Sequence, residues 1–376
     1  MAAARTIVHV LQWPTVAGTE IATLRMIRGL SSPEWRHLAL CAGAPSQTSR
    51  FMEEGGVRAC GYRMPDLSLR RPGPFFVASL RASRLLRHLG ADLVHCSDLA
   101  AGIYTTLAAR LARIPVVCHI RNPLSHLSRR ERLLLSGVSR FIFVSRDSWE
   151  RFALPVGPDR GSVIYDGIDV SPLDHQEARK ALNAELGIPP SAQVVGMVAR
   201  LAEQKDHATF IRAAARVVAE RPDVRFLVVG DHDTTEAYRA FHRRLVQEVQ
   251  ARGVGGHVIF TGYRTDIPRV LAGLDVFVLA THFEGFGLAV IEAMAQGRPT
   301  ISTAVGGVTE IVEDGMNGLL HRHEDDADLA AKLLLVLRDE ALARRLGQAG
   351  FESVRARFGP ATLAKEVRAV YESVLG

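Results

Sequence analysis

Short apolar runs alternate with longer amphipathic stretches from one end of the chain to the other. In the first half the apolar runs lie at Thr6–Leu11, His37–Cys41, Leu93–Cys96, Val116–Ile120 and Phe141–Val144. In the second half they lie at Val194–Val198, Arg225–Val229, Val258–Phe260, Val276–Leu279 and Thr300–Ser302. Helical patterns fall between them, for example at Glu20–Leu30, Pro74–Leu89, Ala208–Glu220, Glu236–Arg252 and Leu288–Gln296. Unbroken apolar strands separated by helices predict parallel sheets that are covered on both faces.

A stretch rich in turn-forming residues, 165–172, separates the two series and precedes a polar helix predicted at Asp174–Leu186. The 376 residues are enough for two domains with separate cores. We therefore predict two doubly wound α/β domains, at residues 1–170 and 171–359, followed by an amphipathic helix at 360–376. Ligands of such sheets bind at the carboxyl ends of the strands.

Charge is distributed unevenly between the two halves. Residues 1–170 hold 22 Arg and no Lys against 13 Asp and Glu, so this half carries +9 and the remainder −3. The excess indicates either an anionic partner or a solvated Arg-rich surface. No apolar run reaches the roughly 20 residues that span a bilayer. The apolar part of Met1–Leu11 is too short for a secretion signal, which favours a cytoplasmic protein.

The four cysteines also favour a reducing compartment. Cys41, Cys60, Cys96 and Cys118 form no C-x-x-C pair, and most lie in or beside predicted strands. We interpret them as buried thiols.

The segment Glu284–Glu292 carries the strongest chemical signal. A buried strand runs into a turn with Gly285 and Gly287, and a helix is predicted to start near Gly287. Free N–H groups at such a helix start favour a phosphate, and the glycines let the backbone approach it. Glu284 and Glu292 suit the hydroxyls of a sugar and a ribose. Taken alone, the segment is equally compatible with an ordinary strand-to-helix turn that carries two surface glutamates and binds no ligand.

A second loop of the same predicted domain supplies cations. Arg200 and Lys205 stand five residues apart after the strand Val194–Val198. Both are able to reach a diphosphate from there, although each is also compatible with a solvent-facing charge.

With these motifs the chain resembles glycosyltransferase family 4, the retaining group with the GT-B fold. The matching runs are Glu284–Glu292, Ala199–Asp206, Phe260–Pro268 and Ala304–Gly315. The resemblance is specific over about residues 190–320 and looser before them. It implies two Rossmann-like domains that face a central cleft, with the final helix returning to the first domain.

The resemblance also implies roles for single residues. Arg200 and Lys205 hold the donor diphosphate, and Glu292 receives the ribose hydroxyls. Glu284 meets the transferred sugar together with the amides of Gly285, Phe286, Gly287 and Leu288. The backbone at Tyr263 and Arg264 borders the base. His119, at the end of the strand Pro115–Ile120, contacts the donor sugar and joins Glu284, Arg200 and Lys205 as a catalytic residue.

Three positions depart from the family pattern. Asp231-His-Asp replaces the usual glycine-proline turn after Phe226–Gly230, and Thr309 replaces a common proline. Ala17 replaces the first of two glycines before the predicted helix Glu20–Leu30, which leaves Gly18 to approach the diphosphate or acceptor. Thr19 is the expected N-cap of that helix.

The expected reaction is transfer of a sugar from a nucleoside-diphosphate sugar, UDP preferred and GDP the alternative, to a hydroxyl of a glycan, lipid-linked or small-molecule acceptor. Asp98 and Ser145 are weaker acceptor-side candidates. No metal, further cofactor or nucleic acid is expected. His321-Arg-His323 is interpreted as a polar loop.

The basic stretch Leu69–Leu89 either packs its apolar face inward or touches an anionic membrane. A nucleotide-sugar epimerase of the same fold and a non-catalytic nucleotide-sugar-binding protein remain alternatives. A dehydrogenase is disfavoured because the first strand is not followed by G-x-G-x-x-G.

Overall fold

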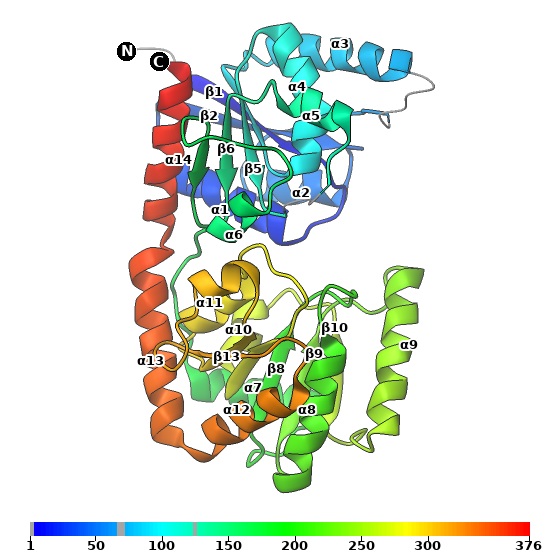
Figure 1. The fold of residues 1–376 in the computed structure, drawn as a ribbon, viewed down its shortest axis with the longest axis vertical. Coiled ribbons are helices and arrows are strands. Elements are labelled where there is room, and N and C mark those ends of the chain that lie inside the picture. The colour runs from blue at the N-terminus through cyan, green and yellow to red at the C-terminus, as the bar shows by residue number, and fades with distance from the viewer. Residues whose placement is uncertain (1–3, 66–71, 123–125) are drawn as a thin grey trace. The chain divides into compact units, whose positions relative to one another are not determined.

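The structure, a computed structural model, describes residues 4–65, 72–122 and 126–376 and divides into two compact units (Figure 1). The first unit comprises the chain up to Ile168 together with Pro360–Gly376, and the second comprises Asp169–Gly359. Each unit holds one sheet in which every described strand pair is parallel. The predicted α/β class with parallel sheets is therefore confirmed.

The first sheet has the order β3-β2-β1-β4-β5-β6-β7. Its strands are β1 (Arg5–Leu11), β2 (Trp35–Ala42), β3 (Ala59–Tyr62), β4 (Leu93–Cys96), β5 (Val116–Ile120), β6 (Arg140–Phe143) and β7 (Gly161–Val163). The order reverses between β1 and β4, which creates a switch point where loops diverge at the carboxyl edge.

Helices cover both faces of this sheet. They are α1 (Gly18–Leu30), α2 (Gln47–Glu54), α3 (Pro72–His88), α4 (Leu99–Ala112), α5 (Arg129–Leu135), α6 (Arg146–Glu150) and α14 (Pro360–Leu375). One face buries Val8, Val94 and Val116 against α3 and α4, and the other buries Ile7, Leu93 and Val117 against α1 and α14. Because successive strand residues point to opposite faces, this double burial explains the unbroken apolar runs.

The last helix belongs to the first unit although it is made from the end of the chain. α14 packs against α1, and its Leu363, Val367 and Tyr371 lie in the same apolar cluster as Ile7. The Tyr371 hydroxyl lies 2.6 Å from Nδ1 of the fully buried His95. The prediction that the final helix returns to the first domain is therefore confirmed.

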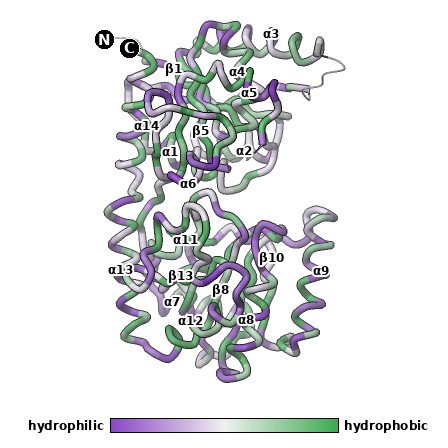
Figure 2. Tube along the Cα trace, viewed as in Figure 1, coloured by the Kyte–Doolittle hydropathy of each residue, from purple (hydrophilic) through white to green (hydrophobic). Residues whose placement is uncertain are grey.

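The second sheet has the order β10-β9-β8-β11-β12-β13. Its strands are β8 (Val194–Val198), β9 (Arg225–Val229), β10 (Val258–Gly262), β11 (Val276–Leu279), β12 (Thr300–Thr303) and β13 (Leu319–His321). The helical segments are α7 (His175–Leu186), α8 (His207–Glu220), α9 (Glu236–Ala251), α10 (Ile267–Ala272), α11 (Leu288–Ala295), the 3-10 turn η1 (Gly306–Glu310), α12 (Asp326–Arg338) and α13 (Glu340–Arg357). Helices such as α9 and α13 alternate hydrophobic and hydrophilic residues along their length (Figure 2).

The hydrophobic pattern of the sequence does not predict three short strands. β3, β7 and β13 have four, three and three residues, too few to show an apolar run. The interpretation of His321-Arg-His323 as a polar loop is accordingly wrong for His321, which ends β13 and is buried.

Candidate functional site

The two loops with the strongest sequence signals meet at the switch point of the second sheet. β8 and β11 are neighbours in the sheet, and the direction in which the chain adds strands reverses between them. The loop after β8 carries Arg200 and Lys205, and the loop after β11 carries Glu284–Gly287. In an open α/β sheet this is the place where a ligand binds.

Gln204 ties these two loops together. Its backbone oxygen accepts hydrogen bonds from His282 N at 2.9 Å and from the Thr281 hydroxyl at 3.0 Å. Its Nε2 donates to Phe283 O at 2.9 Å. The position of Glu284 relative to Lys205 is therefore set by a network centred on Gln204, a residue to which the sequence assigned no role.

Lys205 and Glu284 form a largely buried ion pair between Nζ and Oε2. Their side chains are 12% and 15% exposed, so solvent screens the charges only partly. Arg200 is exposed and makes a 3.5 Å contact with Gln204 Oε1. One cation is thus held in place by the carboxylate, while the second remains accessible beside it.

Two glycines of η1 support the Glu284 loop from behind. A Cβ on Gly306 would lie 2.1 Å from Glu284 O, and one on Gly307 would lie 2.3 Å from Gly285 O. Gly306 also has a positive φ of +54°. The backbones approach so closely that no other residue fits at either position. The paired glycines are the sequence signal for this contact.

Helix α11 begins at Leu288, with Gly287 as its N-cap at φ 114°. Among the described residues no hydrogen-bond acceptor contacts the N–H groups of Gly287 and Leu288. These groups, with the positive end of the helix dipole, have the chemistry that favours an anion. The predicted helix start near Gly287 is confirmed.

The remaining donor-side candidates differ in what their side chains do. Phe286 is buried and packs edge-to-face on Phe358, so only its backbone is available to a ligand. Glu292 is half-buried on α11. Tyr263 is 63% exposed after β10. The Arg264 guanidinium pairs with Asp266 and Glu185, and these hydrogen bonds raise its pKa.

The unusual Asp231 after β9 stabilises its own loop. Its Oδ1 accepts hydrogen bonds from Asp233 N and Thr234 N, both at 3.1 Å. A carboxylate thus fixes the turn by side-chain bonding where a glycine-proline turn was expected.

At the switch point of the first sheet, Gly18 is the exposed first residue of α1. The expected N-cap Thr19 is wrong: the cap residue is Ala17, and Glu20 Oε2 accepts from Ala17 N at 2.9 Å. A glutamate in the first turn caps the helix, so no hydroxyl is needed. Burial raises the pKa of Glu20 to about 7.

His119 lies in the first unit, at the end of a diagonal row of four imidazoles. The row runs over β2, β1, β4 and β5 as His37, His9, His95 and His119, with ring centroids 5.2, 5.3 and 5.6 Å apart. His119 is fully buried, and neither ring nitrogen has a hydrogen-bond partner among the described residues. Burial lowers its pKa well below the ordinary value, so the ring is neutral.

The other polar groups near this edge are structural. Asp98 and Ser145 cap α4 and α6 by accepting from Ala101 N and Ser148 N. Buried Arg121 makes a two-pronged ion pair with Asp166 at 2.9 and 3.1 Å. This pair anchors the segment that leads out of the first unit, and the sequence gave no sign of it.

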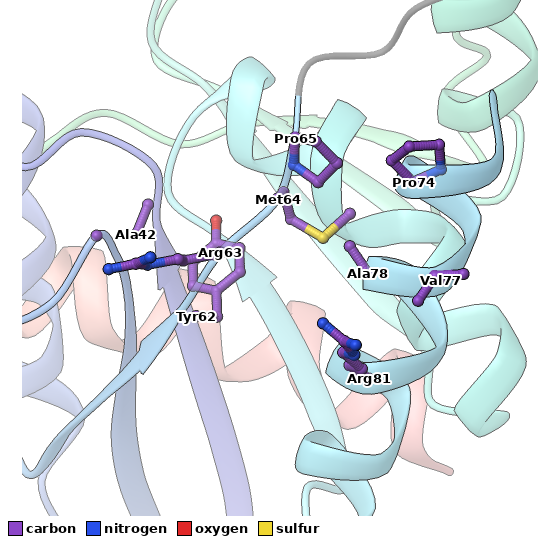
Figure 3. A pocket seen from close by; sticks show the side chains of 10 residues that line it. Ala42, Tyr62, Arg63, Met64, Pro65, Pro74, Val77, Ala78 and Arg81 are labelled. Carbon is purple, nitrogen blue, oxygen red and sulfur yellow. The ribbon is translucent and has the colours of Figure 1, made fainter. Parts of the chain in front are cut away.

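A cavity of about 950 Å³ opens beside the ends of β2 and β3 in the first unit. Figure 3 shows Met64 reaching toward Ala78 and Arg81 extending from α3, while Arg63, just after β3, points toward the side of Ala42. Neither arginine makes a hydrogen bond or ion pair with the part of the chain that the structure describes.

The basic stretch Leu69–Leu89 is only partly described. Residues 69–71 lie outside the described residues, and α3 exposes Phe76, Val77 and Leu80. Within the described ranges no helix has the length and apolarity to cross a bilayer.

Two Rossmann-like units with parallel sheets define the GT-B class of glycosyltransferases, and solved structures of that class superpose on the chain. The UDP- and glucose-bound HepE of Anabaena aligns with a TM-score of 0.83 over 98% of this chain and 99% of HepE, at 23% identity. Sucrose-phosphate synthase from Thermosynechococcus elongatus aligns with a TM-score of 0.79 over 98% of both chains, at 22% identity.

Two family models match the chain in succession. The model "Glycosyltransferase Family 4" matches residues 16–172, and "Glycosyl transferases group 1" matches residues 178–353. The chain therefore belongs to the group 1 / family 4 glycosyltransferases and is an enzyme.

Curated relatives are transferases with different sugars and acceptors. A 2-deoxystreptamine glucosyltransferase of Streptomyces kanamyceticus is 29% identical over 95% of this chain and 99% of its own length. A 2-deoxystreptamine N-acetyl-D-glucosaminyltransferase of Streptomyces fradiae is 27% identical over 95% and 92%. The lipopolysaccharide core mannosyltransferase LpsB of Rhizobium meliloti is 31% identical over 57% of this chain, and the match spans 61% of LpsB.

Proposed function

We propose that the chain transfers a sugar from a UDP-sugar to a hydroxyl acceptor with retention at the anomeric carbon. The second unit binds the donor, and the first unit binds the acceptor. The observation that carries the proposal is the arrangement at the β8–β11 switch point. There, the loop that carries Arg200 and Lys205 adjoins the loop that leads to the free N–H groups of Gly287 and Leu288, and the Lys205–Glu284 ion pair joins the two loops.

Two cations and a helix start on adjoining loops match a diphosphate better than a single phosphate. Glu284 pairs with Lys205, and its carboxylate has the acceptor atoms that sugar hydroxyls require. Glu292 lies one turn into α11, where we expect the ribose. UDP is preferred over GDP because the structural neighbour HepE is a complex with UDP and glucose.

In the proposed reaction the bond from the anomeric carbon to the diphosphate oxygen breaks, and a bond to the acceptor oxygen forms on the same face. The leaving diphosphate gains negative charge, which Lys205, Arg200 and the helix N–H groups stabilise. The acceptor proton passes to an oxygen of the leaving phosphate. The transfer step thus requires neither a protein base nor a metal ion.

The alternatives left open by the sequence lose support. The curated relatives are named transferases, which favours transfer over an epimerase or a non-catalytic nucleotide-sugar-binding protein.

A thermal-shift panel of UDP, GDP, ADP and NAD tests the donor proposal. A ligand at 100 times its Kd stabilises the folded state by about 2.7 kcal/mol. For a unit of this size that corresponds to a rise in Tm of about 5–10 °C. We expect UDP to give the largest shift. If none of the nucleoside diphosphates shifts Tm, the donor proposal is wrong.

Lys205→Met tests the site directly, with Lys180→Met as its matched control. Lys180 is an exposed lysine of the same unit, on α7. Loss of one charge-assisted hydrogen bond costs about 1.5–3 kcal/mol, or about 10- to 150-fold in Kd. We expect calorimetry to show this loss for Lys205→Met and none for Lys180→Met. Equal UDP affinity in the two variants would remove Lys205 from the site.

For the acceptor side we propose that the cytoplasmic chain touches an anionic membrane through α3. The support is a run of exposed apolar side chains, Phe76, Val77 and Leu80, followed on the same helix by exposed Arg81 and Arg84. Co-sedimentation with vesicles tests this. We expect binding to vesicles containing phosphatidylglycerol and weaker binding to the double variant Phe76→Ser/Leu80→Ser. Equal sedimentation of both proteins would exclude a contact through α3.

A further inference from the structure

Three potential metal ligands meet on the surface of the second unit. They are His282 from the loop after β11, and His323 and Glu324 from the loop after β13. Their ligand atoms all lie within 4.8 Å of one another, and no other group of three His, Cys, Asp or Glu in the described ranges does this. None of the three takes part in the proposed donor contacts.

The spacing of the three atoms matches one ion. His282 Nδ1 lies 2.9 Å from His323 Nε2 and 3.3 Å from Glu324 Oε1. Ligand atoms at about 2.0–2.1 Å from a tetrahedral Zn²⁺ are separated by about 3.3 Å. The three side chains therefore converge on one point, and small rotations of exposed rings would bring the distances to those of a coordinated ion.

The backbones that carry the ligands are fixed in relation to each other. His282 N donates to Gln204 O at 2.9 Å. The buried Thr303 hydroxyl, at the end of β12 between the two loops, lies 3.0 Å from Thr281 N and 3.0 Å from His321 Nε2. Thr303 thus joins the residue before His282 to the strand that leads to His323. A site on such a frame loses little entropy when an ion binds.

The chemistry of the ligands selects the ion. Two imidazole nitrogens and one carboxylate oxygen are the set that Zn²⁺ takes with three protein ligands and a water. Ca²⁺ and Mg²⁺ prefer oxygen ligands alone. The nearby cation Arg322 is paired with Asp325 and Asp328, so its charge is balanced by acids outside the cluster.

We propose that His282, His323 and Glu324 bind one Zn²⁺ ion, with solvent completing its coordination, and that the ion joins the β11–α11 loop to the β13–α12 loop. The site is separate from the proposed transfer chemistry. Its effect is to hold the loop in which Glu284 follows His282 by two residues.

The test uses the full chain without a histidine tag, stripped with a chelator and kept reduced. Zn²⁺ is titrated in competition with a chromophoric chelator. We expect one site per chain, and an increase in Tm when Zn²⁺ is added. His282→Ala and Glu324→Gln should each weaken binding by at least about 10-fold, the smallest loss typical even for a supporting residue of a metal site.

His242→Ala is the matched control. His242 stacks on His232 at 4.4 Å in the same unit, a histidine pair that belongs to no such group of three ligands in the described ranges. We expect this variant to bind Zn²⁺ as the unaltered chain does. Co²⁺ should give the strong visible absorption of a four-coordinate ion in the unaltered chain and in His242→Ala only. Absence of a stoichiometric site, or unchanged affinity in both His282→Ala and Glu324→Gln, would overturn the proposal and leave the three side chains as a hydrogen-bonded surface cluster.

Discussion

Replacing His37 by Asn is expected to make the first unit more resistant to acid. His37 lies on β2, and its Nδ1 is 3.0 Å from His9 Nε2. Burial lowers the pKa of His37 from the ordinary 6.5 to about 4, so the folded chain keeps the ring neutral where the unfolded chain binds a proton. The stability that this provides is fully present above about pH 6.5 and is lost as pH falls toward 4.

The size of the effect follows from the two pKa values. Each unit of pKa difference is worth 1.36 kcal/mol, so the full loss below pH 4 is about 3 kcal/mol. Between pH 7 and pH 5 the loss from this one ring is about 2 kcal/mol. Asn keeps a polar atom near the position of Nδ1 but does not titrate. The variant should therefore lose about 2 kcal/mol less stability over this range than the unaltered chain.

Tryptophan fluorescence isolates the relevant unit, because Trp13, Trp35 and Trp149 are the three tryptophans of the chain and all lie in the first unit. Urea unfolding at pH 7 and pH 5 gives the free energy of unfolding for both proteins. The raised pKa of Glu20, about 7, acts in the opposite direction, since its contribution is lost as pH rises, but it is common to both proteins. An equal drop in stability for His37→Asn and the unaltered chain would refute the reasoning.

Four further substitutions have defined outcomes. Gly306→Ala places a Cβ 2.1 Å from Glu284 O at a position with positive φ, and the positive φ alone costs about 1–2 kcal/mol. We expect calorimetry to show about 10-fold weaker UDP binding. An unchanged Kd would contradict the conclusion that η1 supports the Glu284 loop. Glu284→Gln should retain UDP binding, because it releases Lys205, and lose sugar transfer; unimpaired transfer would exclude Glu284 from the reaction. His119→Asn should keep UDP binding and lower the transfer rate, and a full rate would assign the ring a structural role only. Arg121→Met should destabilise the first unit by about 3–5 kcal/mol because it leaves Asp166 buried without its partner, and urea unfolding at the stability of the unaltered chain would contradict this.

The sequence predicted the fold well where strands are buried on both faces. β1 and β8 are unbroken, mostly apolar runs of seven and five residues, the pattern of strands buried on both faces of a parallel sheet. The short edge strands β3 and β13 escaped, because three or four residues do not establish a period. Their position depends on pairing with a neighbour that is already in place, which is tertiary information.

The candidate site divides in the same way. Glu284, Gly287 and Lys205 stood in linear motifs with a local physical meaning, a turn that opens a helix and a cation after a strand. The role of Gln204 depends on which loops are neighbours, so it became evident only with the strand order of the second sheet. The sequence predicts Thr19 as the N-cap, because hydroxyl side chains often cap helices. The competing solution, a glutamate that reaches back to the Ala17 N–H, requires knowing where the helix starts.

Helix α14 has a consequence for the order in which the protein is made. Its Val367 and Tyr371 complete the core around Ile7 and His95, yet the ribosome makes them only after the entire second unit. The whole of Asp169–Gly359 is synthesised in between, which takes about 10–40 s at 5–20 residues per second. During that interval one face of the first sheet has α1 but lacks α14 as its cover. The nascent chain thus carries an exposed apolar surface that a chaperone can bind until α14 has been made.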